Sequence, residues 1–289
     1  MKRILFAIIA LAIVACTKEE TPEPTKILNL TIGDFPAYDI ATRAGESVGK
    51  TAWENGDKLL IEYYDNYGDM MLGQGNPSRH IASYNDGSWT LNTPIKLAAG
   101  AGATDCIIAV YRPGFEWSDD GTVTVGGNEP TVSQLLQSET LVVYNSIEGE
   151  NHTLTFSNII DDEVVKSSIM MRYNRFRIIG TPNATITIDA NDCLYSGRDY
   201  MYSPSFGGPE DITLDESGNA FIYLRWPENS TDPELYITPA GGAEITIKLP
   251  YGEDDGIDAP YPYSEVIDGM YLCIHAYAYS IDLRSVMKR

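Results

Sequence analysis

Short strand-like runs recur along the chain, and they constrain its fold more than any other feature of the sequence. Apolar runs of about four to eight residues, some alternating with polar residues, are bounded by Gly, Asn, Asp and Pro, which is typical of β-strands joined by turns. The runs of the first half are Lys58–Asp65, Arg79–Tyr84, Ser88–Leu91, Thr104–Arg112, Thr122–Val125, Leu141–Asn145 and His152–Ile159. Those of the second half are Met171–Ile179, Ala184–Asp189, Ala220–Arg225, Glu234–Ile237, Glu244–Leu249 and Met270–Leu283. The sequence therefore predicts an all-β fold built from β-sandwiches.

The length and one acidic stretch indicate how the chain divides. Its 289 residues are enough for two domains of about 100–150 residues each. Asp161–Glu163 is the predicted junction, which gives an N-terminal domain over residues 44–160 and a C-terminal domain over residues 161–289. The segment Ser133–Glu139 fits either one helical turn or a loop.

The first fifteen residues are typical of a secretory signal peptide. A short basic head precedes the unbroken apolar run Ile4–Val14, which is too short for a permanent membrane helix of about 20 residues. The run ends in Ile13-Val14-Ala15-Cys16, which looks like a bacterial lipobox, so Cys16 is the predicted lipidation site. The alternative is an ordinary signal peptide followed by a chance cysteine. Two or three acyl chains, at about 0.8 kcal/mol per buried CH₂, would hold the protein on a membrane.

Residues 16–43 combine a tether with an alternating strand. Proline and charge keep the stretch after Cys16 from packing. Leu28, Leu30 and Ile32 then share one face of a strand with period two. A polar connection with a single basic residue, Arg43, follows before Trp53 and its turn. We interpret the strand as removable and the Arg43–Ala44 bond as the place where it is cut, although any exposed loop arginine can be nicked by a protease.

The last long strand-like run offers a candidate strand for exchange between subunits. Its alternation places seven side chains on one face: Tyr271, Cys273, His275, Tyr277, Tyr279, Ile281 and Leu283. The alternative is that this run is only the last strand of the C-terminal domain, and both states could occur at different stages of assembly.

Composition and motifs exclude several classes of function. The formal net charge of −21 leaves no basic patch for nucleic acid. The stretch Gly45–Thr51 has the wrong glycine spacing for a phosphate-binding loop, and none of the three histidines belongs to a metal or triad motif. Acidic turns lack the ligand spacing of a calcium loop. We therefore expect no catalytic residues, no bound metal and no cofactor, and we expect a protein that is not an enzyme.

Several features in a fixed order resemble the fimbrillin-like family of Bacteroidales lipoproteins, the major fimbrial subunits or type V pilins. They are the lipobox, the early alternating strand, Thr42–Gly45, Trp53 with Gly56-Asp57-Lys58, Arg172–Ile179 and the tyrosine-rich run after Asp268. The resemblance covers the whole chain. It implies two transthyretin-like β-sandwich domains in tandem and an outer membrane lipoprotein exposed at the cell surface. It also implies an arginine-specific protease that releases the strand Ile27–Phe35 by cutting at Arg43.

What the resemblance implies for function is a structural pilin subunit. The groove left by the first strand would accept the C-terminal strand of another subunit, and repetition would build an extracellular fimbria. The partners would be other pilin subunits, the protease and, before cleavage, the outer membrane through the lipid. The alternative is a tip adhesin or a non-polymerising surface lipoprotein that binds a glycan or a host protein.

Overall fold

The computed structural model describes residues 26–36, 50–66, 69, 76–98, 105–118, 122–156, 168–190, 193–195, 207–225, 234–248, 263–267, 270–273 and 278–286. The described residues form an all-β fold, as the sequence predicts. The strands before residue 160 are β1 (Asn29–Ile32), β2 (Lys58–Tyr64), β3 (Ser78–Asn85), β4 (Ser88–Leu91), β5 (Cys106–Tyr111), β6 (Glu116–Trp117), β7 (Val123–Thr124), β8 (Leu141–Ser146) and β9 (Asn151–Leu154).

The later strands are β10 (Ser168–Arg172), β11 (Asn174–Ile179), β12 (Thr185–Asp189), β13 (Leu194–Tyr195), β14 (Glu210–Thr213), β15 (Asn219–Arg225), β16 (Glu234–Thr238), β17 (Ile245–Lys248), β18 (Tyr263–Ile267), β19 (Met270–Cys273) and β20 (Ala278–Asp282). The helices are α2 (Val132–Leu136) and α3 (Leu283–Val286). No helix in these described ranges is long and apolar enough to cross a membrane.

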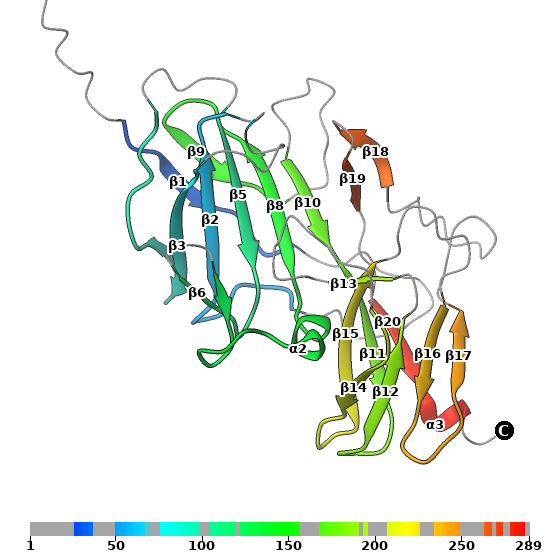
Figure 1. The fold of residues 1–289 in the computed structure, drawn as a ribbon. Coiled ribbons are helices and arrows are strands. Elements are labelled where there is room, and N and C mark those ends of the chain that lie inside the picture. The colour runs from blue at the N-terminus through cyan, green and yellow to red at the C-terminus, as the bar shows by residue number, and fades with distance from the viewer. Residues whose placement is uncertain are drawn as a thin grey trace, which may run out of the picture.

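A six-stranded sheet with the order β10-β8-β5-β2-β3-β4 dominates the first half of the chain (Figure 1). Its central strands β2 and β5 are buried along almost their whole length, because side chains cover both faces of the sheet. On one face, Leu59, Ile61 and Ile107 belong to a core that also includes Leu28 and Leu154. The sequences of these central strands are therefore largely apolar without alternation, apart from Lys58 and the buried Glu62 of β2.

Two four-stranded sheets enclose a second core. Their orders are β13-β15-β11-β20 and β14-β12-β16-β17. Phe176, Ile188 and Leu235 lie at the centre of this core. Phe115 and Leu136, which precede the predicted junction, also pack into it. Figure 1 shows α2 beside β14 and β15 accordingly.

The chain crosses between the two groups of strands after the predicted junction at residues 160/161. β10 follows that junction and still extends the six-stranded sheet by pairing with β8. β11 begins two residues after β10 ends and pairs with β15 in the second core. The division into two domains at 160/161 stays a prediction.

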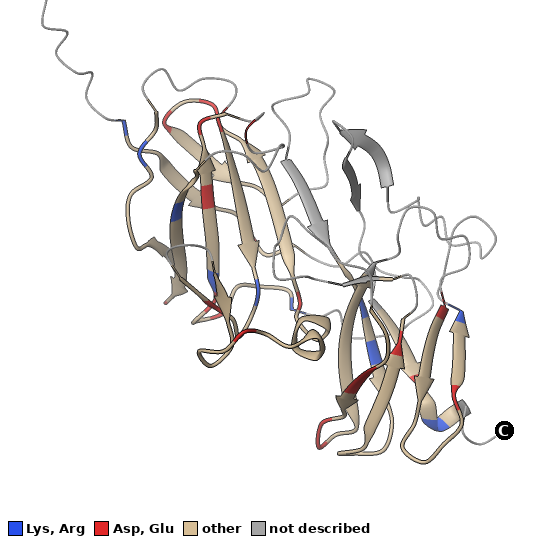
Figure 2. Cartoon of the chain, viewed as in Figure 1, with Lys and Arg blue, Asp and Glu red and all other residues tan. Residues whose placement is uncertain are grey.

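Local sequence explains the turns that set this topology. Asp86-Gly87 joins β3 and β4, and both residues have positive φ, which the tight hairpin requires. The helix α2 begins at a capping box in which Thr131 and Gln134 satisfy each other's backbone N–H groups. Figure 2 shows Asp and Glu positions in both groups of strands, in keeping with the net charge of −21.

Candidate functional site

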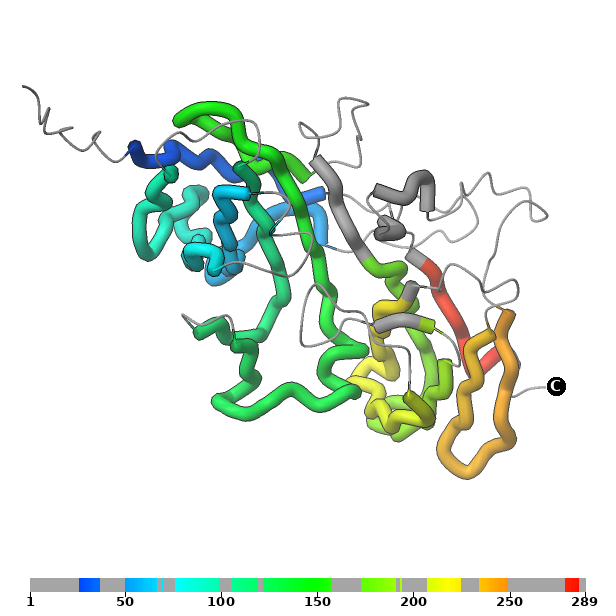
Figure 3. Tube along the Cα trace, turned by 45° about the horizontal axis from the view of Figure 1, so that its top comes forward, coloured from blue at the N-terminus to red at the C-terminus, as the bar shows by residue number. Residues whose placement is uncertain are grey.

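The segment that contains the first strand bonds to two later parts of the chain, at different positions along its length. β1 runs parallel to β9, and Figures 1 and 3 show the two side by side. On that side the Asn29 N–H donates to the Glu150 carbonyl (2.7 Å), and the Gly33 N–H donates to the Leu154 carbonyl (3.0 Å). On the other side, the Leu28 N–H donates to the Ile95 carbonyl at 2.9 Å. Residues 29–33 therefore pair with β9, whereas the bond to Ile95 is made by Leu28, just before β1.

Alternating side chains of β1 fill the first core. Leu28 is 3% exposed, and Leu30 and Ile32 are partly buried against the same core. Asn29 and Thr31 are exposed. The predicted period-two face of Leu28, Leu30 and Ile32 is confirmed as a structural feature, while displacement of the strand stays a prediction.

An aromatic side chain holds the end of this segment. Phe35 is buried against the rings of Trp53 (centroid distance 4.7 Å) and Tyr111 (5.6 Å), both in edge-on geometry. The Lys50 ammonium lies 5.7 Å from the centre of the Phe35 ring. We name Trp53, Tyr111 and Lys50 the Phe35 box. All three residues follow Arg43 in the chain, whereas Phe35 precedes it.

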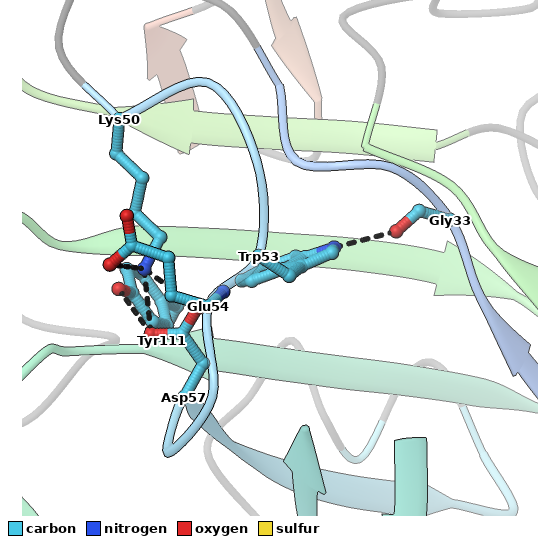
Figure 4. A network of polar contacts seen from close by, with 6 residues as sticks. All are labelled: Gly33, Lys50, Trp53, Glu54, Asp57 and Tyr111. Carbon is cyan, nitrogen blue, oxygen red and sulfur yellow. Dashed lines mark hydrogen bonds and ion pairs between the residues drawn. The ribbon is translucent and has the colours of Figure 1, made fainter. Parts of the chain in front are cut away.

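Polar contacts fix the Phe35 box (Figure 4). The Trp53 indole N–H donates to the Gly33 carbonyl at 2.8 Å, which links the box to the segment that ends β1. The Lys50 ammonium lies 2.7 Å from the Asp57 carboxylate, and the Tyr111 hydroxyl donates to the same carboxylate at 2.9 Å. Burial, and then the charge of Asp57, raise the pKa of Tyr111 well above its ordinary value, so this hydroxyl stays a donor.

Gly33 brings β1 close to the backbone of β9. A Cβ atom at this position would lie 3.0 Å from the Leu154 carbonyl oxygen. A side chain here would push the two segments apart by a few tenths of an ångström. The β1 site, by which we mean the Phe35 box together with residues 95–97 and 150–154, therefore favours a small residue at this position.

The candidate C-terminal strand is divided between two sheets in the described residues. Tyr271 and Cys273 belong to β19, which pairs with β18 in a two-stranded sheet. Tyr279 and Ile281 belong to β20, which pairs in parallel with β11 of its own chain. Tyr279 stacks on Phe176 at a centroid distance of 5.0 Å.

Leu283 is 1% exposed, so the last three members of the predicted face pack on the second core. Leu283 begins α3 rather than ending a strand. His275 and Tyr277 lie outside the described residues. Donation of this segment to another subunit stays a prediction.

The remaining predicted positions are placed as follows. Cys16, Arg43 and Ala44 lie outside the described residues. Cys106 is buried in the six-stranded sheet, and burial raises the pKa of its thiol to about 12. Within the described ranges, no group of His, Cys, Asp and Glu side chains is arranged to hold a metal ion.

Comparison with known proteins gives structural similarities alone. No protein-family model matches the chain, and no curated protein does. A candidate cell adhesion protein from Bacteroides fragilis is 12% identical, with a TM-score of 0.38 over 90% of this chain and 93% of that one. The tip fimbrial protein Mfa3 from Porphyromonas gingivalis, truncated at its C-terminus, is 13% identical, with a TM-score of 0.30 over 76% of this chain and 81% of that one.

A candidate cell adhesion protein from Bacteroides eggerthii is 12% identical, with a TM-score of 0.32 over 78% of each chain. At these identities and scores the similarities assign neither a family nor a function to this chain. The fold and the β1 site themselves define an all-β protein whose first strand pairs with β9 and whose preceding residues bond to residues 95–97.

Proposed function

We propose that the chain is a structural pilin subunit of surface fimbriae that polymerises by donor-strand exchange. In this proposal it is exported as a lipoprotein through Cys16 and cut between Arg43 and Ala44. The segment that contains β1 then leaves, and a strand from another subunit enters the β1 site. The observation that carries the proposal is that the first segment is held by backbone bonds to two later parts of the chain: residues 29–33 bond along β9, and Lys26 and Leu28 bond to residues 95–97.

The position of the proposed cut relative to these contacts supports the mechanism. Residues 37–49 are the covalent link between the Phe35 end of the segment and the Phe35 box, and Arg43 lies within them. After cleavage, only non-covalent contacts would hold the segment. A strand that is held only by such contacts can be replaced by another strand that makes the same ones.

The free energy contributed by these contacts explains why the cut segment would need an incoming strand to replace it. Burial of Leu28 and Phe35 contributes about 1.5–3 kcal/mol each. Each backbone hydrogen bond adds about 0.5–1.5 kcal/mol net. A cut segment would therefore stay bound for long times by itself. Loss without replacement would expose the apolar face and unpaired strand edges, which favour association with another chain.

The Arg43→Ala variant tests the proposal. We expect a folded, lipidated protein that forms no polymer, since the first strand keeps its covalent link. Arg43→Lys is the matched variant, because it keeps the positive charge and removes only the arginine. Intact mass and N-terminal sequencing of protein recovered from the cell surface should give Ala44 for the parent and acylated Cys16 for both variants. Normal fibres from Arg43→Ala would contradict the mechanism.

A second candidate function is a fimbrial tip adhesin or a non-polymerising surface lipoprotein. One observation favours it: β20 pairs with β11 of its own chain, as in a subunit that keeps its last strand. In that case the parent protein would be recovered as a monomer, starting at acylated Cys16 for the anchored form or at Ala44 for a tip. Binding of a glycan or a host protein would then be its activity.

A further inference from the structure

β9, the strand that bonds to β1, is also fixed from its other side. Among the strands that the structure describes, β9 pairs with β1 alone. At the end of this pairing, the Leu154 carbonyl accepts from the Gly33 N–H. Successive residues of a strand direct their backbone groups to opposite sides, so those of Thr155, the next residue, point away from β1. The partner of Thr155 therefore bears on whether β9 keeps its place when β1 is absent.

One buried side chain bonds to both backbone groups of Thr155. Asn145 lies on β8 of the six-stranded sheet and is 2% exposed. Its Oδ1 accepts from the Thr155 N–H at 2.7 Å, and its Nδ2 donates to the Thr155 carbonyl at 3.2 Å. A neighbouring antiparallel strand would offer the same pair of donor and acceptor. The Asn145 amide therefore takes the place of a strand on the side of β9 that faces away from β1.

Two further contacts orient the Asn145 amide. Its Nδ2 also donates to the Tyr144 carbonyl at 2.6 Å, and the His152 Nε2 lies 3.3 Å from its Oδ1. An amide oxygen only accepts hydrogen bonds, so Nε2 is the donor in this contact. His152 belongs to β9 and pairs with Leu30 of β1. These bonds select one orientation of the amide, in which every contact joins a donor to an acceptor.

We propose that Asn145 is the positioning residue that keeps β9 in place when β1 is absent. This inference rests on the proposed function, because it concerns the site that an incoming strand would occupy. The contacts of Asn145 lie within β8, β9 and Thr155, which all follow Arg43, so departure of β1 after cleavage would leave them intact. The receiving edge is then formed in advance, and an incoming strand does not have to order it on binding.

The second receiving segment is fixed without Asn145. The Ala98 N–H, next to residues 95–97, donates to the Tyr63 hydroxyl at 3.0 Å, and this hydroxyl donates to the Asp105 carboxylate at 3.0 Å. Tyr63 and Asp105 are both buried. A change at Asn145 should therefore loosen β9 and spare residues 95–97, which makes these residues an internal reference for the experiment.

An emptied β1 site in the full-length chain tests the role of Asn145. Leu28→Asp places a charge in the first core and should keep β1 from docking. A fluorescent synthetic peptide with the parent sequence of residues 26–36 is then the probe for the empty site. Asn145→Leu is similar in size to the parent residue but carries no hydrogen-bonding group. In the Leu28→Asp chain it should lower the association rate of the peptide by about tenfold or more.

Ser146→Ala is the matched control for Asn145→Leu. Ser146 is the next residue of β8 and is also buried, and its hydroxyl lies 2.8 Å from the Tyr144 hydroxyl. Successive side chains of a strand point to opposite faces, so Ser146 faces away from β9. The control should leave the association rate close to that of the chain with Leu28→Asp alone. Equal association rates for Asn145→Leu and Ser146→Ala would overturn the proposal.

Hydrogen exchange gives a second measurement that does not need an empty site. In the uncut chain with its native Leu28, Asn145→Leu removes the acceptor of the Thr155 N–H. That amide should then exchange about tenfold faster or more, while the amides of residues 95–97 keep the parent's rates. An unchanged rate at Thr155 would overturn the proposal. Equally faster exchange in both segments would also overturn it, because it would show a general loss of stability.

The outcomes separate this inference from the proposed function. If Asn145→Leu forms polymer at the parent's rate after cleavage, the pilin function stands and the positioning role of Asn145 is overturned. If peptide binding depends on Asn145 but the cleaved parent chain forms no polymer, the role of Asn145 stands and the pilin function fails.

Discussion

Truncation of Phe35 is the change that most directly measures how the first strand is held. Phe35 is 6% exposed and contacts Trp53, Tyr111 and Lys50 of the Phe35 box. Phe→Ala changes in protein cores cost about 3–5 kcal/mol. The neighbouring Asp34 is exposed, so the site lies near the surface and has some freedom to collapse. We therefore expect Phe35→Ala to lower the free energy of unfolding by about 3 kcal/mol.

The assay is urea unfolding followed by circular dichroism. The urea concentration at the midpoint of unfolding should fall, while the dependence of the free energy of unfolding on urea concentration stays unchanged. This is the pattern of a loss of stability without a change in the surface exposed on unfolding. The same loss should weaken retention of the cut strand by about two powers of ten. That retention is measured as the rate at which the residue 16–43 fragment leaves after cleavage at Arg43.

Ile27→Ala is the matched control for Phe35→Ala. Ile27 lies in the same segment but is 47% exposed. We expect it to change stability by less than about 0.5 kcal/mol, as surface substitutions do. If Phe35→Ala falls within that range too, the Phe35 box does not hold the strand and the reasoning is wrong.

Three further changes test the same site and its surroundings. Trp53→Phe removes the indole N–H that donates to the Gly33 carbonyl and should cost about 1–2 kcal/mol in urea unfolding; an unchanged midpoint would contradict that contact. Gly33→Ala should cost about 1–3 kcal/mol, because its Cβ would crowd the Leu154 carbonyl, and a stabilised variant would show that the backbone gives way freely. Burial lowers the pKa of His80 and of His152 below 6.5. The neutral forms therefore stabilise the fold above that pH, and the stability should fall as the pH drops below it. Replacing both histidines with Gln should reduce this loss of stability at acid pH, as measured by thermal unfolding. An equally steep loss in the variant would exclude the two histidines as its cause.

Local patterns predicted the strands well, because a strand buried on one face has alternating apolar residues and a strand buried on both faces has an apolar run. The alternation of Leu28, Leu30 and Ile32 gave the inward face of β1, and the structure confirms it. Lys58–Asp65 is observed as β2, one residue shorter. The Asn85-Asp86-Gly87 turn is also confirmed, since only a few residue types accept positive φ at a tight hairpin.

Contacts between distant segments could not be predicted in the same way. Nothing near Phe35 in the sequence indicates that its ring meets Trp53 and Tyr111, because that meeting depends on how β5 lies beside β2. The packing of Phe115 and Leu136 on the second core is likewise a tertiary result. The sequence leaves the segment Ser133–Glu139 open between one helical turn and a loop, and the structure has a short helix at Val132–Leu136. A usable local signal for it is the capping box of Thr131 and Gln134.

The contacts of β1 explain why a cut at Arg43 would make replacement of this strand possible. Every member of the Phe35 box follows Arg43, and so do β9 and residues 95–97, which bond to the segment that contains β1. Cutting after Arg43 would therefore leave the whole β1 site on one fragment and the whole strand on the other. Before the cut the strand competes at a high effective concentration set by the short link of residues 37–49. After the cut that advantage is lost, while every contact of the site remains available to an incoming strand, so replacement becomes possible without any change in the fold that receives it.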